Sequence, residues 1–507
     1  MIAEMSRSVQ AGFPLLSMLI ALPLLGMAAG WVVKSARQAF ILGVACAGVE
    51  LALTIRLLSS FQTGAASLQF VERLPLTPFL AYHLGVDGVS VLFVTLTALL
   101  TLLVILYGEI VHERPAGIYV ASVFAFEAVL MGLFLSIDLL EFWLVSLLEL
   151  IPATFILSRW GVGPAKDYAV TRYLQDMIGG LALMLGGILI LGWNHAETTG
   201  DWSFALGDLA TAPISRTQQS LIFVLLFYGL AVRMALFPFH AWLPIVAQHG
   251  PLATICVFLV GLKVGIYALL RFVLPLLPDA VHAWKGFVVA LGMIGIFYGA
   301  LLALMQINLR RLLAFAAVSH IGMLVIGVFC LNVEGLAGSL LLAITFGVAA
   351  SGLLFVTGVI YRSTRTTLMP RLGGMFDALP LLGLTFLLAA LSTMAMPGTP
   401  GFDAAHLMLE GAIETHHWGV AVAMATGSVA SAAFLLWAFQ RVFLAQRRDT
   451  VLRPEKIRLS VSEAALAGAV CVVLLGVGFY TKPWMEIVDG SLADLARRFE
   501  SPAPQSK

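Results

Sequence analysis

The chain has 507 residues, of which 60% are hydrophobic and 11% are charged, and its formal net charge is +1 at pH 7. Soluble globular proteins carry about 25% charged residues, so the composition excludes an ordinary soluble protein and indicates one that crosses a membrane many times. It also argues against a nucleic-acid-binding protein, because no basic surface is available to neutralise phosphates.

Apolar runs of about 20 residues, the length that spans a bilayer, predict an all-α membrane protein of about fourteen transmembrane helices. The runs cover residues 14–33, 38–60, 87–108, 117–136, 137–158, 168–193, 218–240, 252–275, 284–305, 311–331, 335–360, 379–400, 416–441 and 463–481. The first run lacks a small-residue cleavage site after a short apolar core, so we expect a retained helix and not a signal peptide.

The polar connections are short, and none predicts a soluble domain. The longest, 194–217 and 442–462, have the length of loops, and the tail from 482 holds a candidate surface helix around 484–500. We therefore expect residues 1–507 to form one transmembrane domain, with core repeats at about 117–275 and 284–441 and peripheral helices at 14–108 and 463–481.

Basic residues gather in the loops that follow odd-numbered helices. The positive-inside rule then places these loops in the cytoplasm and both termini on the opposite side of a bacterial inner membrane. The basic residues are Lys34, Arg37, Arg159, Lys166, Arg310, Arg311, Arg362, Arg365, Arg371, Arg447, Arg448, Arg453, Lys456 and Arg458.

Two segments, 218–244 and 379–406, share a pattern of an apolar helix broken by paired prolines and followed by a histidine. They lie five helices apart, so they enter the membrane from opposite sides, as in an inverted repeat with discontinuous helices. Prolines alone would indicate only kinks. The prolines and histidines are Pro238, Pro244 and His240 in the first segment, and Pro397, Pro400 and His406 in the second.

Two cations, Arg233 and Lys263, lie deep in apolar runs around the first break. A charge at membrane depth costs at least about 2.5–3.5 kcal/mol, so it is expected to face protein or a water-filled path. Lys263 lies mid-run, which favours a proton-relay lysine over a cation that snorkels to an interface. For Arg233 the position is compatible with a pathway role or with a structural ion pair.

Further titratable residues are candidates for the same pathway. Glu127 lies mid-run, and His320 can exchange protons near neutral pH. Glu149, Asp176, Asp403 and His406 are weaker candidates for a rearranged path, Asp87 fits a helix cap equally well, and His240 and Trp242 flank the first break in positions that suggest structural roles.

The sequence predicts no catalytic residue, cofactor site or metal site. Its cysteines, Cys46, Cys256, Cys330 and Cys471, are scattered singly in apolar runs without CxxC spacing, which favours buried thiols over zinc or iron–sulfur ligands. No glycine-rich phosphate loop follows a strand, so nucleotide binding is not indicated.

Several long motifs occur in the order found in one known family. They are Tyr82-His83-Leu84-Gly85-Val86-Asp87-Gly88-Val89-Ser90, Phe237-Pro238-Phe239-His240-Ala241-Trp242-Leu243-Pro244, Gly261-Leu262-Lys263-Val264-Gly265 through Arg271, Tyr298-Gly299-Ala300-Leu301, Val318-Ser319-His320-Ile321-Gly322, and Met396-Pro397-Gly398-Thr399-Pro400-Gly401-Phe402. With these motifs the chain resembles subunit M of bacterial complex I, the proton-translocating NADH:quinone oxidoreductase, within the antiporter-like superfamily of membrane subunits.

The resemblance implies that protons cross along a buried line of carboxylates, lysines and histidines, while other subunits bind NADH and quinone. Glu127, Lys263 and His320 match charged or polar positions of the family, and Arg233 stands where the family has a lysine. The family's fifth-helix glutamate falls on Leu147, its eleventh-helix histidine on Phe346 and its twelfth-helix acid on Ala405.

These departures have physical consequences. At about 100° per residue, Glu149 points about 200° away from Leu147, so we do not expect it to replace the missing acid. Arginine stays protonated in essentially any protein setting, so Arg233 could anchor or gate by pairing but not pass on its own proton. The usual coupled pair of a carboxylate and a lysine is therefore expected to be absent.

The sequence thus predicts a proton-translocating subunit of a complex I-type enzyme, with no redox site of its own. Expected partners are other membrane subunits, peripheral subunits, the lipid bilayer and protons, but not nucleic acid. The alternatives are a diverged ion-coupling subunit of an inorganic-carbon uptake complex or cation/proton antiporter, or a non-conducting structural subunit.

Overall fold

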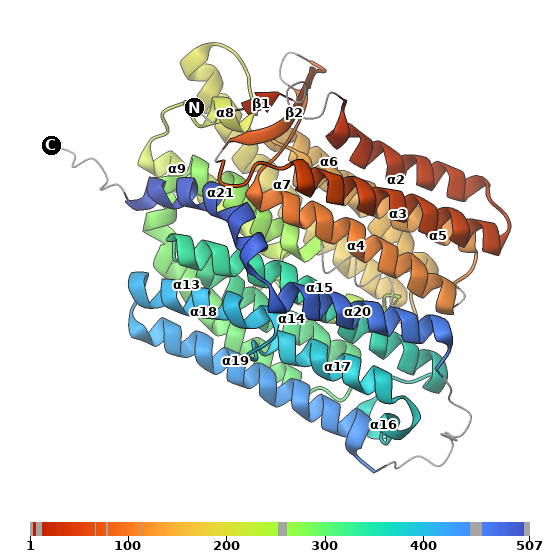
Figure 1. Ribbon diagram of the computed structural model, residues 1–507. Coiled ribbons are helices and arrows are strands. Elements are labelled where there is room, and N and C mark those ends of the chain that lie inside the picture. The colour runs from red at the N-terminus through yellow and green to blue at the C-terminus, as the bar shows by residue number, and fades with distance from the viewer. Residues whose placement is uncertain are drawn as a thin grey trace.

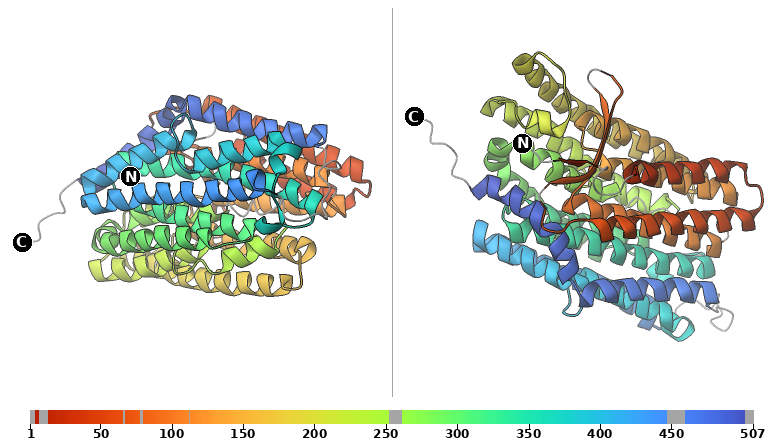
Figure 2. Two further views of the ribbon diagram at one scale, coloured as in Figure 1. Left: turned by 90° about the horizontal axis from the view of Figure 1, so that it is seen from below. Right: turned by 45° about the horizontal axis from the view of Figure 1, so that its top comes forward.

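The computed structural model describes residues 4–6, 13–65, 67–77, 80–111, 113–251, 261–446 and 459–500. Over these residues the chain forms a bundle of long, roughly parallel helices with a small sheet at one end (Figures 1 and 2). In the described residues ten helices are long and apolar enough to cross a membrane, or up to eleven if a bent pair counts as one span. The helical membrane fold is confirmed, whereas the expected count of fourteen is not fully reached.

The ten spanning helices agree closely with ten of the expected runs. They are α2 (Leu15–Val32), α3 (Ala36–Ser60), α4 (Gly88–Val111), α5 (Ala116–Leu135), α6 (Leu139–Trp160), α7 (Lys166–Thr199), α13 (Pro278–Leu304), α14 (Leu309–Val328), α15 (Val333–Thr364), and α19 (Trp418–Phe439) with its π-helical extension η3 (Gln440–Leu444). Short connecting helices are α8 (Leu206–Leu209), η2 (Met369–Arg371) and α16 (Met375–Ala378).

The other four expected runs fall short for identifiable reasons. Two are broken, into α9 (Arg216–Arg233) and α10 (Trp242–His249), and into α17 (Pro380–Thr393) and α18 (Pro400–Thr415). The run 252–275 is described only from residue 261, where a helix leads into η1 (Leu269–Val273) and α12 (Leu274–Leu276). The fourth, α20 (Val461–Phe479), belongs to the bent pair with α21 (Lys482–Glu500).

The two breaks have the same backbone. After α9 and after α17, three successive N–H groups donate to carbonyls four, three and five residues earlier. The alanine at each turn, Ala235 or Ala395, has a left-handed φ of 55° or 57°. The expected pair of discontinuous helices is therefore present.

Further features recur in the same order. Asp138 caps α6 and Asn308 caps α14, each accepting backbone N–H bonds of the first turn. Each cap also forms an isolated bridge to a later loop, with Ala205 and Leu368 respectively. The π-helices η1 and η3 follow the helices that come after the two breaks. The cap, the isolated bridge, the break and the π-helix thus occur twice in the same order.

The small sheet was not expected from the sequence. Strand β1 (Glu4–Ser6) lies parallel to β2 (Leu68–Pro75), which pairs antiparallel with β3 (Ala81–Val86). The sheet lies at the same end of the bundle as the amphipathic α21 (Figure 1). The surface helix expected around 484–500 is thus confirmed.

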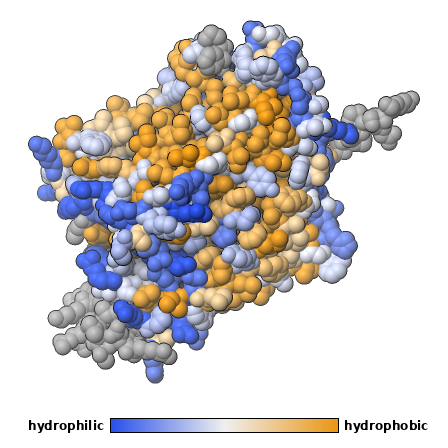
Figure 3. Space-filling model, turned by 180° about the vertical axis from the view of Figure 1, so that it is seen from behind, coloured by the Kyte–Doolittle hydropathy of each residue, from blue (hydrophilic) through white to orange (hydrophobic). Residues whose placement is uncertain are grey.

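The centre of the bundle is formed by α14 and α15, which are buried along almost their whole length. In contrast, α2 and α3 bury only a stripe and expose apolar side chains such as Leu25, Val32 and Ile41. Figure 3 shows apolar side chains over a broad area of one face. This surface suits lipid or neighbouring membrane subunits.

Candidate functional site: a buried row of charged side chains

The first broken helix ends on a buried ion pair. Arg233, the last residue of α9, donates through its terminal nitrogen to Glu149 of α6, and both side chains are buried. Two glycines of the helix segment 261–268 make room: a Cβ at Gly261 would lie 3.3 Å from Glu149 Oε1, and one at Gly265 would lie 2.8 Å from Met234 Cβ. The pair therefore lies against the helix segment that carries Lys263.

This pair corrects the expectation drawn from Leu147. Glu149 and Leu147 do point in different directions, since Leu147 is 41% exposed on the outer surface and Glu149 only 5%. However, α6 is rotated so that the face of Glu149 is the inward one. A carboxylate–cation pair is therefore present, two residues further along the chain than the resemblance placed it.

Lys263 lies at the centre of the row. Its side chain is 0% exposed, and its ammonium has no hydrogen-bond acceptor among the described residues. The nearest favourable contact is the ring of Phe346 of α15, whose centroid lies 4.5 Å from Nζ. A cation–π contact stabilises an ammonium but accepts no proton from it. An ammonium held this way has no ion-pair partner that fixes its charge.

His320 lies on the other side of this cluster. The His320 ring, on α14, stacks on Phe346 with centroids 3.8 Å apart and planes 17° from parallel. Phe346, which takes the place of the family's histidine, thus contacts both Lys263 and His320. The structure brings these three residues together at the centre of the bundle.

Glu127, on α5, is a further buried acid and has an unexpected neighbour. It is fully buried, and its carboxylate oxygens make no hydrogen bond within the described residues. Glu50 of α3 is also fully buried, makes no hydrogen bond in the described part of the chain, and is close enough to act on Glu127 electrostatically. Glu50 was not among the expected pathway residues, although an acid in the middle of the run 38–60 is the same signal that selected Glu127.

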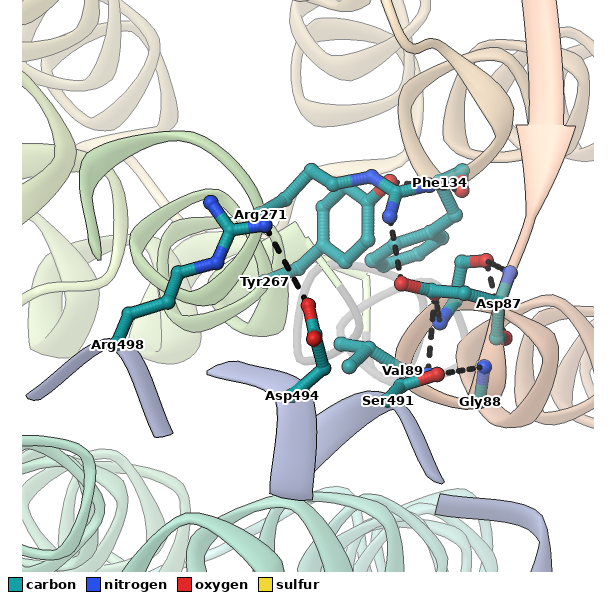
Figure 4. A network of polar contacts seen from close by, with 10 residues as sticks. Asp87, Gly88, Val89, Phe134, Tyr267, Arg271, Ser491, Asp494 and Arg498 are labelled. Carbon is teal, nitrogen blue, oxygen red and sulfur yellow. Dashed lines mark hydrogen bonds and ion pairs between the residues drawn. The ribbon is translucent and has the colours of Figure 1, made fainter. Parts of the chain in front are cut away.

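About two helical turns beyond Lys263, Arg271 of η1 begins a polar network (Figure 4). Arg271 donates to Asp87 at 2.6 Å, while the other Asp87 oxygen accepts from Val89 and Ser90 N–H and so caps α4. Ser491 of α21 accepts a bond from Gly88 N–H. Asp87 therefore acts as a helix cap and as an ion-pair partner that fixes η1 to the start of α4.

The residues that flank the first break have structural contacts. Trp242 donates to the carbonyl of Val232, which has lost its bond from the N–H four residues later because Leu236 N–H donates to Ala231 instead. His240 is buried among the rings of Phe237, Tyr298 and Phe315. These contacts agree with the structural roles suggested for both residues.

Three weaker candidates lie elsewhere. Asp176 pairs with Arg172 one turn earlier on the half-exposed face of α7. Asp403, in the first turn of α18, accepts a bond from Thr481 at the bend between α20 and α21. His406 is exposed and stacks on Phe402. The structure does not bring these three residues to the Lys263 cluster.

Metal and thiol chemistry find no support in the part of the chain that the structure describes. Its cysteines, Cys46, Cys330 and Cys471, are free thiols, and no cluster of three potential ligands occurs there. Cys256 lies outside the described residues.

Residues 136–431 match the family described as NADH:quinone oxidoreductase/Mrp antiporter, transmembrane. NADH-ubiquinone oxidoreductase chain 4 of Marchantia polymorpha is 30% identical over 488 residues, covering 95% of this chain and 97% of the relative. NADH-quinone oxidoreductase subunit M of Rhodobacter capsulatus is 30% identical over 461 residues, covering 89% of each chain.

Solved structures agree with this match. A chain of respiratory complex I from Thermus thermophilus with bound NADH superposes with a TM-score of 0.87 at 27% identity, covering 96% of this chain and all of that one. A chain of the Mrp complex from Dietzia sp. has a TM-score of 0.85 at 20% identity, over 96% of this chain and 98% of that chain, which shows a shared fold. The chain therefore belongs to the family of NADH:quinone oxidoreductase and Mrp antiporter transmembrane subunits.

Proposed function

We propose that the chain is an M-type membrane subunit that translocates protons in a complex I-type NADH:quinone oxidoreductase of a bacterial inner membrane. The observation that carries this proposal is Lys263, a fully buried lysine without an acceptor in the middle of a row of titratable side chains. The named relatives from Marchantia polymorpha and Rhodobacter capsulatus support the redox assignment.

In the proposed mechanism Lys263 carries the proton and Arg233 does not. Desolvation makes a buried lysine able to lose its proton, whereas the guanidinium keeps its charge. Arg233 therefore acts as a fixed positive charge whose effect on Lys263 depends on how fully Glu149 neutralises it. A movement of Glu149 would change the field at Lys263, which is how a local displacement could drive proton release.

Glu127 and His320 are the proposed lateral groups on either side of this centre. We assign Asp403 and His406 at most to the far end of the pathway, near the second break. We assign NADH oxidation and quinone reduction to partner subunits, with other membrane subunits alongside this one.

We further propose an inverted repeat over about 117–275 and 284–441, with peripheral helices at 14–108 and 463–481. The paired caps, breaks and π-helices support this division. By the positive-inside rule, the basic residues support a cytoplasmic position for the loops that follow the first, third and other odd-numbered apolar runs of the sequence, and this would place both termini on the outer side. Some of these basic residues lie outside the described residues, namely Arg447, Arg448, Arg453, Lys456 and Arg458.

Purification of the tagged protein from its native membrane, with mass spectrometry of what accompanies it, tests this assignment. We expect flavin and iron–sulfur subunits of a respiratory complex. A single large zinc-bearing partner would instead indicate an ion-coupling subunit of a substrate uptake system, and isolation without redox or uptake partners would indicate a scaffold.

A further inference from the structure

Glu50 and Glu127 come from two helices that run in the same direction. Successive spanning helices alternate in direction, so α3 and α5, separated by α4, are parallel. Their contact is fixed near the start of each: a Cβ at Gly43 would lie 3.1 Å from Val120, and the rings of Phe40 and Tyr119 lie 6.5 Å apart.

The two carboxylates follow this contact by the same number of residues. Glu50 comes seven residues after Gly43, and Glu127 seven residues after Val120. Seven residues make almost two helical turns and about 10 Å of rise, so both side chains return to the contacting faces at the same depth. Glu50 is accordingly buried, although its neighbour Val49 is 52% exposed on the outer surface.

No positive group compensates the two acids in the described chain. Neither takes part in an ion pair or a hydrogen bond there. The titratable or polar groups nearby are Cys46 on α3 and Thr101 on α4. The described part of α2 has no titratable side chain, and on α6 Glu141 and Glu149 bind other partners.

Two ionised carboxylates in this setting would be strongly unfavourable. Burial of one uncompensated charge already costs several kcal/mol, and two like charges at one site repel each other. A proton on one carboxyl removes the repulsion and leaves a single buried charge. The pair therefore binds a proton in these surroundings, and release of that proton requires the surroundings to change.

We propose that Glu50 and Glu127 form a proton-binding site of two carboxylates, which stores a proton at the α3 end of the buried row. The binding of the proton follows from the geometry of the pair. Its use as a store during transport rests on the proposed function. The site would extend the row from the core helices into a peripheral helix.

Infrared spectroscopy of the intact complex tests the binding site directly, because protonated carboxyl groups absorb apart from carboxylates. At neutral pH we expect a protonated-carboxyl band that shifts in Glu50→Gln and in Glu127→Gln and is lost in the double variant. Glu109→Gln, which changes an exposed acid on α4, serves as the matched control and should leave the band unchanged.

Three results would overturn the site. The first is a double variant that retains the whole band, and the second is a carboxylate signal that responds to sodium, which would identify a cation site. The third is failure of both single variants to assemble, since glutamine is a neutral substitute of equal size for a protonated glutamic acid.

The storage role has a separate readout. If the two acids act as one unit, the proton-to-electron ratio should fall in each single variant and fall no further in the double variant. If the infrared band changes in the variants as expected but their proton-to-electron ratio does not, the storage role is overturned and the binding site is not. A wild-type complex that shows the band but pumps no protons would count against the proposed function and not against the site.

Discussion

The two broken helices have the same backbone turn but different chemistry. At the first break Arg233 precedes the turn and pairs with Glu149. At the second break Thr393 takes the equivalent position, one residue before Met394 as Arg233 is before Met234, and its hydroxyl bonds to the carbonyl of Ala389 on its own helix. A helix break at membrane depth thus needs no charge to be stable.

The helices that follow the breaks differ in the same way. The segment after the first break carries Lys263, whereas α19, after the second, has no charged residue or histidine from Trp418 to Phe439. The second break therefore keeps the backbone turn without a cation like Arg233 before it, and α19 lacks a cation like Lys263. The two cations around the first break are accordingly assigned to function and not to folding.

The largest expected effect comes from removal of the central charge. Lys263→Ala should abolish coupled proton transport while the complex still assembles, because Lys263 makes no ion pair or hydrogen bond that assembly depends on. Proton uptake by proteoliposomes containing the purified complex measures this. Lys285→Ala, on α13, is the control and should transport normally. Wild-type transport by assembled Lys263→Ala complexes would rule out the central role.

The next effect concerns the ion pair that only the first break has. Arg233→Ala should destabilise the protein by about 3–5 kcal/mol, because it leaves a buried carboxylate unpaired. The double variant, Arg233→Ala combined with Glu149→Ala, should recover much of this loss of stability, because it removes the unpaired carboxylate as well. Thr393→Ala, at the second break, should cost only about 0.5–1.5 kcal/mol. Thermal unfolding of the solubilised protein compares the variants.

Arg216→Ala is the matched control for the pair. Arg216 lies on the same helix, and its contact with Asp279 is 3.9 Å long and exposed, so it should contribute about 0–1 kcal/mol. Equal losses of stability in Arg216→Ala and Arg233→Ala would show that the buried ion pair stabilises the protein no more than the exposed one.

A smaller effect, on the pH dependence of stability, should distinguish the N-terminal cap of α6, Asp138, from that of α14, Asn308. Burial raises the pKa of Asp138 to about 6, above the usual value near 3.9 for an unfolded aspartate. The folded state therefore binds the proton more tightly, and stability should fall by at most about 3 kcal/mol as the pH rises from 4 through 6. Asp138→Asn should lose this dependence, and Asn308→Asp at the other cap should gain one. Unfolding midpoints measured across this pH range would decide, and identical profiles for wild type and Asp138→Asn would contradict the expectation.

The sequence predicted ten of the spans, both breaks and the burial of Lys263, because hydropathy, proline and charge each leave a local signal. It did not predict that Glu149 meets Arg233. Helical periodicity fixes the angle between two residues of one helix but not the rotation of that helix in the bundle, and α6 is rotated to bury Glu149. The pairing of Glu50 with Glu127, 77 residues later in the chain, cannot be seen in the sequence. The strands are too short to stand out among the apolar runs.

The smallest expected effect tests the turn that both breaks share. An alanine with a left-handed φ costs about 1–2 kcal/mol relative to the usual conformation, and glycine removes this strain at an entropic cost of about 0.5–1 kcal/mol. Ala395 is partly exposed, so Ala395→Gly should stabilise the protein by up to about 1 kcal/mol. Ala235 is fully buried, and loss of its methyl contacts, about 0.8 kcal/mol, should cancel the gain in Ala235→Gly. Only Ala235→Gly, which loosens the turn beside Arg233, should also lower the proton-to-electron ratio. Equal effects of the two variants on transport would mean that the breaks act alike despite their different charges.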